Sequence, residues 1–157
     1  PDDRGTQMFT GTGAYAVAWQ LLDLGDATTV PQAFTLSGWL GGWLGQGDNA
    51  LLYAAFLGTD DSEIGSAALG PVGPADRGSA TGLFYREVAD WLPVGTAKVT
   101  FWLSMERQGG GDNDGYADNL AFVLAAPAAV PEPAGLAWLG LGVLALTSLA
   151  RRRSAQR

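Results

Sequence analysis

The sequence contains no cysteine and no histidine among its 157 residues. Without cysteine there can be no disulfide, no thiolate metal site and no cysteine nucleophile. Without histidine as well, a typical zinc site and a Ser-His-Asp triad are both excluded. The fold must therefore be held by its apolar core or by a structural ion. Any such ion would need oxygen ligands, and these suit calcium.

Basic residues are scarce except at the C-terminal end of the chain. Residues 1–133 carry all 16 acids and a net charge of −11, whereas residues 134–157 carry four arginines and no acid. The two parts together give the net charge of −7. Because an acidic surface repels a phosphate backbone, the body of the protein is not expected to bind nucleic acid.

Long helical patterns are missing from residues 1–126, and several segments alternate with period two instead, as half-buried strands do. In the segment 98–105, Val99 and Leu103 share one face, which places Trp102 on the opposite face. In the segment 15–21, large apolar side chains alternate with small or polar ones. Other strands are expected at 34–37, 49–57, 81–91 and 120–124, with glycine-rich turns between them, for example at Gly41-Gly42. The pattern predicts an all-β, antiparallel β-sandwich of jelly-roll type over residues 1–125.

The composition changes after this body. Residues 126–133 form an Ala/Pro linker, and residues 134–150 are uncharged and rich in Leu, Ala and Gly. As a helix, these 17 residues would span about 25 Å, slightly less than the ~30 Å hydrocarbon core of a bilayer. The sequence predicts a transmembrane helix and basic tail over residues 134–157, with the arginines inside the cell and the body outside. A buried C-terminal helix is the alternative.

Three features of this tail occur in a fixed order: Pro131-Glu132-Pro133, the apolar span, and Arg151-Arg152-Arg153. This order resembles the PEP-CTERM sorting signal. The resemblance implies that Pro131, Glu132 and Pro133 are recognised by an exosortase, a membrane-embedded cysteine-type transpeptidase or protease, and that Arg151, Arg152 and Arg153 stop transfer. It also implies an inner-membrane anchor, release to the cell surface or matrix after processing, and association with exopolysaccharide. An ordinary rigid linker is the alternative for the triplet.

The same resemblance implies an export signal at the N-terminus. The sequence begins at Pro1 without an initiator Met. We therefore expect that the start of this chain is trimmed or processed.

Carboxylates gather in a glycine-rich stretch, residues 109–120, just before the last expected strand. Asp112, Asp114 and Asp118 fall within a few residues of one another. Calcium takes several oxygen ligands, and glycine lets backbone carbonyls join them, so these three residues are candidate calcium ligands. The alternative is a solvated turn in which Asp112 and Asn113 cap backbone groups.

Residues 113–120, together with the phrases at 34–42 and 92–96, resemble galactose-binding-like jelly-roll domains of the carbohydrate-binding-module kind. The resemblance implies a sandwich over residues 13–125 and a structural calcium that uses Asp118. A second acidic stretch, Asp60-Asp61-Ser62-Glu63, is expected to be a solvated charged turn rather than part of a metal site.

Trp102 is the candidate ligand-binding residue, because an exposed aromatic ring can stack against a sugar ring. Trp39 and Trp43 are expected to pack instead. Signals for catalysis are poor, since no local pair of carboxylates stands out. Three functions remain open: a non-enzymatic surface or matrix module that binds polysaccharide or a neighbouring protein, a small glycan hydrolase, or a purely structural envelope component.

Overall fold

The structure is a computed structural model that describes residues 5–125, and these residues form strands and turns with no helix. All of them belong to one compact unit, Pro1–Ala126. The predicted all-β class is confirmed. The strands of the described part are β1 (Phe9–Thr10), β2 (Tyr15–Asp23), β3 (Gln32–Gly42), β4 (Asn49–Leu57), β5 (Glu63–Leu69), β6 (Gly82–Leu92), β7 (Lys98–Glu106) and β8 (Tyr116–Leu124).

Within residues 5–125, no helix is long and apolar enough to span a bilayer. The predicted linker at 126–133 and the predicted transmembrane helix at 134–157 lie outside the described residues. The same holds for the sorting triplet Pro131, Glu132 and Pro133, and for Arg151, Arg152 and Arg153.

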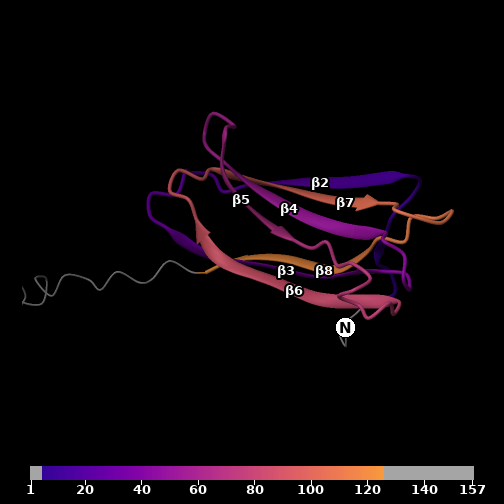
Figure 1. Ribbon diagram of the computed structural model, residues 1–157. Helices are drawn as coiled ribbons and strands as arrows, with labels where there is room; N and C mark the ends of the chain where they lie inside the picture. Colours follow the sequence, from indigo (N-terminus) through magenta and orange to yellow (C-terminus); the bar gives the residue numbers. More distant parts are fainter. Residues whose placement is uncertain (1–4, 126–157) are drawn as a thin grey trace, which may run out of the picture. The chain divides into compact units, whose positions relative to one another are not determined.

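The strands pair antiparallel in two four-stranded sheets, which lie face to face as two layers (Figure 1). Sheet A has the strand order β1-β8-β3-β6, and sheet B has the order β2-β7-β4-β5. The predicted antiparallel sandwich is therefore confirmed. Each sheet has one face toward the core and one outer face toward solvent, so alternate residues of every strand point outward.

Aromatic rings from both sheets meet in the centre of the core. Phe34 of sheet A lies 5.1 Å from Phe56 of sheet B and 5.4 Å from Phe122 of its own sheet, measured between ring centroids. Leu36, Leu40 and Val99 are fully buried around them. Each aromatic pair of this kind contributes about 0.5–1.5 kcal/mol beyond the area that it buries. The rings therefore join the two layers.

The strand β2 reverses the usual relation between residue size and burial. Tyr15, Val17, Trp19 and Leu21 face solvent, with Trp19 at 70% exposure, whereas Ala16 and Leu22 pack against the core. The cause is the register with β7, which sets Trp19 directly opposite Trp102. Directly opposite residues share a face of the sheet. Because Trp102 points outward, Trp19 must do so as well.

The glycines Gly41 and Gly42 are not a turn, as the sequence suggested, but the end of β3. A Cβ atom on Gly41 would lie 1.8 Å from the carbonyl oxygen of Gly82 on β6. Glycine is required here because the two backbones approach closely. The sequence pattern also missed β5 and the short β1.

Candidate functional site

Three aromatic side chains form a row across the outer face of sheet B. Trp19 of β2 lies opposite Trp102 of β7, and Trp102 lies opposite Tyr53 of β4. Neighbouring strands are about 4.8 Å apart. The row, which we call the aromatic row, therefore runs perpendicular to the strands. It contains the predicted ligand-binding residue Trp102 and two residues that the sequence did not single out.

The members of the aromatic row differ in how firmly they are held. The rings of Tyr53 and Trp102 are in contact, with centroids 6.1 Å apart and planes tilted by 41°. The Tyr53 hydroxyl donates a hydrogen bond of 2.6 Å to Glu63 Oε1, which fixes that ring at one end. Trp102 is 37% exposed, whereas Trp19 projects furthest into solvent. Tyr53 and Trp102 are thus already held in place, so a ligand that stacks on the row does not first have to order these two rings.

Apolar residues widen the aromatic row along β2. Tyr15, Val17 and Leu21 share the outer face with Trp19 and are also exposed. Thr100 and Ala55 lie on the same face but are buried, so neighbouring side chains cover them. An exposed apolar surface of this kind is a candidate interaction site.

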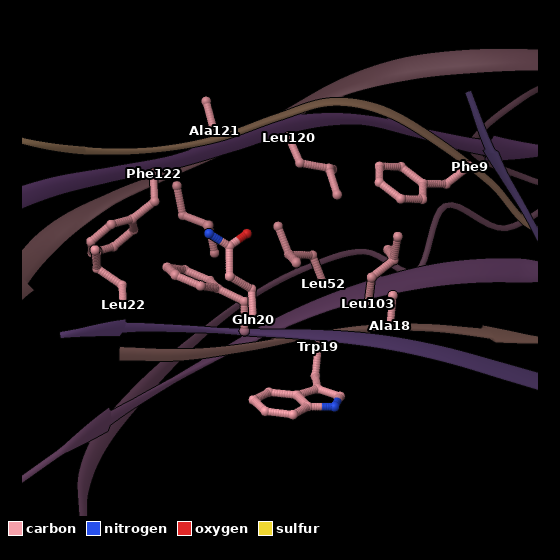
Figure 2. A pocket seen from close by; sticks show the side chains of 12 residues that line it. Phe9, Ala18, Trp19, Gln20, Leu22, Leu52, Leu103, Leu120, Ala121 and Phe122 are labelled. Carbon is pink, nitrogen blue, oxygen red and sulfur yellow. The ribbon is translucent and has the colours of Figure 1, made fainter. Parts of the chain in front are cut away.

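The other side of β2 faces an apolar cavity of about 500 Å³ between the two sheets. Figure 2 shows Gln20 and Leu22 pointing into this cavity, while the Trp19 indole lies on the opposite side of the strand. Of the described residues that line the cavity, Gln20 is the only polar one. Since no carboxylate reaches it, the cavity has no group for acid-base chemistry.

The two other tryptophans considered from the sequence have different surroundings. Trp39 is half-buried on the outer face of sheet A and contacts Tyr85, with ring centroids 5.7 Å apart. Its expected packing is confirmed. Trp43 follows the end of β3 and is 44% exposed, so the expectation that it packs is wrong. The β3 strand ends before this residue, and no sheet covers it.

The three candidate calcium ligands do not form one cluster. Asp114 Oδ1 accepts a hydrogen bond of 2.8 Å from the Tyr116 hydroxyl, and Asp118 Oδ1 accepts one of 2.9 Å from the Asn119 N–H. Asp112 is exposed. Within residues 5–125, no group of three or more acidic side chains is arranged to hold a metal. Calcium at Asp112, Asp114 and Asp118 stays a prediction and would depend on backbone carbonyls.

The second acidic stretch is a solvated turn, as expected. Asp60 Oδ1 accepts hydrogen bonds from the Ser62 hydroxyl and the Ser62 N–H. The Ser62 hydroxyl has the larger effect and lowers the pKa of Asp60. Asp61 pairs with Lys98 at 2.6 Å, and its carboxylate raises the pKa of Lys98. The carboxylates of Asp60 and Asp61 therefore already have partners, in Ser62 and in Lys98 of β7.

The loop at 108–114 is organised by Asp48, a residue that the sequence did not single out. Asp48 is fully buried and accepts three backbone hydrogen bonds, from Gln108, Gly109 and Asp114, at 2.6 to 3.0 Å. Burial raises the pKa of Asp48, but the three N–H donors and the charge of Arg107 outweigh it and leave the pKa below its usual value. The carboxylate is therefore held ionised inside the protein.

A buried cation lies in the adjoining loops. Arg77 is 3% exposed, and its guanidinium donates to the backbone carbonyls of Leu44, Gln46 and Ala80 at 2.8 to 3.0 Å. The loop between β3 and β4 is thereby joined to the loop between β5 and β6 through one side chain. Sequence patterns gave no signal for Arg77 or Asp48, because their partners are backbone groups that lie distant in the sequence.

Comparison with known proteins shows the fold and no more. No protein-family model and no curated protein matches the chain. Among solved structures, it is similar to a family 16 carbohydrate-binding module-2, with a TM-score of 0.51 and 17% identity over 77% of this chain and 79% of that one. It is also similar to the enzymatically active domain of bacteriophage CBA120 tailspike protein 4, with a TM-score of 0.50 and 12% identity. That match covers 75% of this chain but 15% of the tailspike chain. The fold is thus that of a β-sandwich which carbohydrate-binding modules also use.

Proposed function

We propose that the chain is a non-catalytic module that binds polysaccharide through the outer face of sheet B. The observation that carries the proposal is the aromatic row, in which Trp19, Trp102 and Tyr53 lie side by side across three strands. Aromatic ring faces pack well against the apolar C–H face of a sugar ring. The likeness in fold to a carbohydrate-binding module supports this function.

The charge of the protein favours one class of glycan. Residues 1–133 carry a net charge of −11, and the aromatic row itself contains no basic side chain. An anionic polysaccharide would be repelled by this body. Neutral polysaccharides or polysaccharides with amino sugars are therefore the ligands that we propose.

The linings of two cavities, one between the sheets and one beside Trp91, fit binding without hydrolysis better than catalysis. Glycoside hydrolysis needs two carboxyl groups about 5–9.5 Å apart across the scissile bond. The cavity between the sheets has no carboxylate in its lining, and a shallower one beside Trp91 has Asp90 alone. Neither supplies the pair that the alternative, a glycan hydrolase, would require.

The second part of the proposal concerns location and rests on the C-terminal motif. Pro131-Glu132-Pro133, the apolar span and the three arginines support export, a temporary inner-membrane anchor and processing by an exosortase. The mature module would then act at the cell surface or in the extracellular matrix, where polysaccharide is the abundant ligand.

Substitution of Trp19 tests the first part. The Trp19→Ala variant is expected to bind insoluble cellulose or chitin about tenfold more weakly than the wild type, since losing one stacking ring costs on the order of 1.4 kcal/mol. The measurement is a pull-down isotherm with each polysaccharide. Trp43→Ala is the matched control, because Trp43 is an exposed tryptophan away from sheet B. Equal binding by Trp19→Ala and the wild type, or no binding by the wild type to either polysaccharide, would contradict the proposal.

A further inference from the structure

The outer face of sheet A carries a second set of aromatic residues, arranged differently from the aromatic row. Tyr85 and Trp91 both lie on the outer face of β6, and Trp39 contacts Tyr85 from β3. Six residues of a strand extend about 20 Å. The aromatic residues of this face are therefore spaced along the strands and not across them.

Between the two aromatic ends, the floor consists of Ser37, Thr35, Ala89 and Ala121, together with Glu87 and the exposed Val123. Ser37 lies between Ala121 and Glu87, and Thr35 lies between Val123 and Ala89 in the register of β8, β3 and β6. Beside Trp91 the floor is hollowed into a shallow cavity of about 340 Å³. We call this strip, from Trp39 and Tyr85 to Trp91, the sheet A channel. No aromatic ring of this face lies between these two ends in the register of β8, β3 and β6, so an extended chain molecule can lie along the strip.

The charged groups of the sheet A channel are carboxylates, which accept hydrogen bonds. Glu87 accepts a hydrogen bond from the Tyr85 hydroxyl, and this bond raises the pKa of Tyr85. Asp118 lies opposite Trp39 on the same face. Carboxylates accept hydrogen bonds from hydroxyl or ammonium groups and repel anions. The charge of this face is complementary to the same class of glycan as that proposed for sheet B.

We infer that the sheet A channel is a second glycan-binding face, which takes a neutral or amino-sugar polysaccharide along the strands, so that one module bridges two chains. The inference rests on the proposed function of the aromatic row. The two faces belong to opposite layers of the sandwich (Figure 1), so a chain on one does not compete with a chain on the other. Bridging turns a binding module into a cross-linker of a matrix.

Stoichiometry tests the inference. Titration calorimetry with cellohexaose and with chitohexaose is expected to give two bound chains per wild-type molecule and one per molecule of Trp91→Ala or Trp19→Ala. The double variant is expected to bind none, and Trp43→Ala to bind two. Trp91 is 62% exposed, so its removal should leave the thermal melt unchanged. Thr35→Arg provides an independent variant, because its long side chain fills the floor of the channel while every aromatic residue stays.

The outcomes separate the two proposals. If Trp91→Ala and Thr35→Arg both bind as many chains as the wild type, the second face is refuted and the aromatic row stands. If the wild type binds one chain that is lost in Trp91→Ala and kept in Trp19→Ala, the proposed function of sheet B fails and bridging fails with it. As a readout of bridging itself, wild-type protein should raise the viscosity of hydroxyethylcellulose or glycol chitosan solutions, and neither single variant should do so.

Discussion

Asp48 shows how one charged residue can hold a loop that has no regular structure. A buried carboxylate is costly unless every oxygen is hydrogen-bonded. Here Oδ1 accepts from the N–H groups of Gln108 and Gly109, and Oδ2 accepts from the N–H of Asp114. These N–H groups belong to the segment between β7 and β8. The carboxylate therefore fixes the connection by which the chain passes from one sheet to the other.

The stability contributed by Asp48 is expected to depend on pH. A pKa lowered by folding contributes stability that is complete above the unfolded value, about 3.9, and is lost as the pH falls through the lower folded value. At pH 7, Asp48→Asn should cost on the order of 2 kcal/mol, which is roughly 8 °C in Tm for a domain of this size. The difference between the thermal melts of the two proteins should begin to shrink below about pH 4 and disappear only as the pH falls through the lower folded pKa.

Asp26→Asn is the control for this prediction, since Asp26 is an exposed turn residue. It should melt with the wild type at every pH. A difference between Asp48→Asn and the wild type that persists undiminished at pH 2 would show that the ionised carboxylate is not the source of the effect.

At the scale of the strand, the pairing of β3 with β6 depends on Gly41. An added Cβ would meet the Gly82 carbonyl oxygen at 1.8 Å and its carbon at 2.8 Å. Both atoms are backbone, so the strands themselves would have to separate. Gly41→Ala is therefore expected to lower the free energy of unfolding by on the order of 3 kcal/mol or more, as measured by urea denaturation.

Gly111→Ala is the matched comparison, because a Cβ at Gly111 meets no atom within 4 Å and its backbone φ is not positive. It should be nearly neutral. Similar losses of stability in the two variants would mean that the close approach of β3 and β6 is not what requires glycine at position 41.

The sequence predicted well those strands in which the period-two alternation of side chains matches the alternation of buried and exposed positions. In β7, Val99 and Leu103 are buried and Trp102 is exposed, as the alternation indicated. The strand β5 was missed because its sequence, EIGSAAL, has small side chains and little contrast between its faces. The turn expected at Gly41-Gly42 was wrong, because a glycine pair can reflect close approach of strands as well as a turn.

The same reasoning explains how much of the candidate site the sequence contained. Trp102 could be placed on the outer face from its own strand. Trp19 could not, because its face follows from the register of β2 with β7, which local sequence does not determine. Tyr53 joins the row only through β4, a strand separated from β7 by the 40 residues 58–97. A row across strands is a property of the sheet.

At the scale of the whole molecule, binding and charge complement each other. Both outer faces of the sandwich carry exposed aromatic rings, and the body that bears them is strongly acidic. Like-charged modules repel one another and stay soluble. Such modules would associate through the glycan chains that they bridge instead of through direct contacts. A cross-linker of this kind is suited to a matrix, which requires that the proposed membrane anchor be removed.

Processing of the C-terminal tail can be tested on the protein as cells make it. Protein recovered from cells of the source organism should end near Pro131–Pro133, as measured by intact mass, because we propose that an exosortase recognises this motif and cleaves there. Loss of the 24 residues after Pro133 removes a charge of +4, so isoelectric focusing should show a more acidic product. Replacement of Pro131, Glu132 and Pro133 by alanine should leave full-length protein in the membrane fraction, whereas Pro127→Ala, outside the motif, should be processed normally. Full-length wild-type protein in the membrane fraction would instead make the tail a permanent anchor, and the module would then bind polysaccharide only beside the inner membrane.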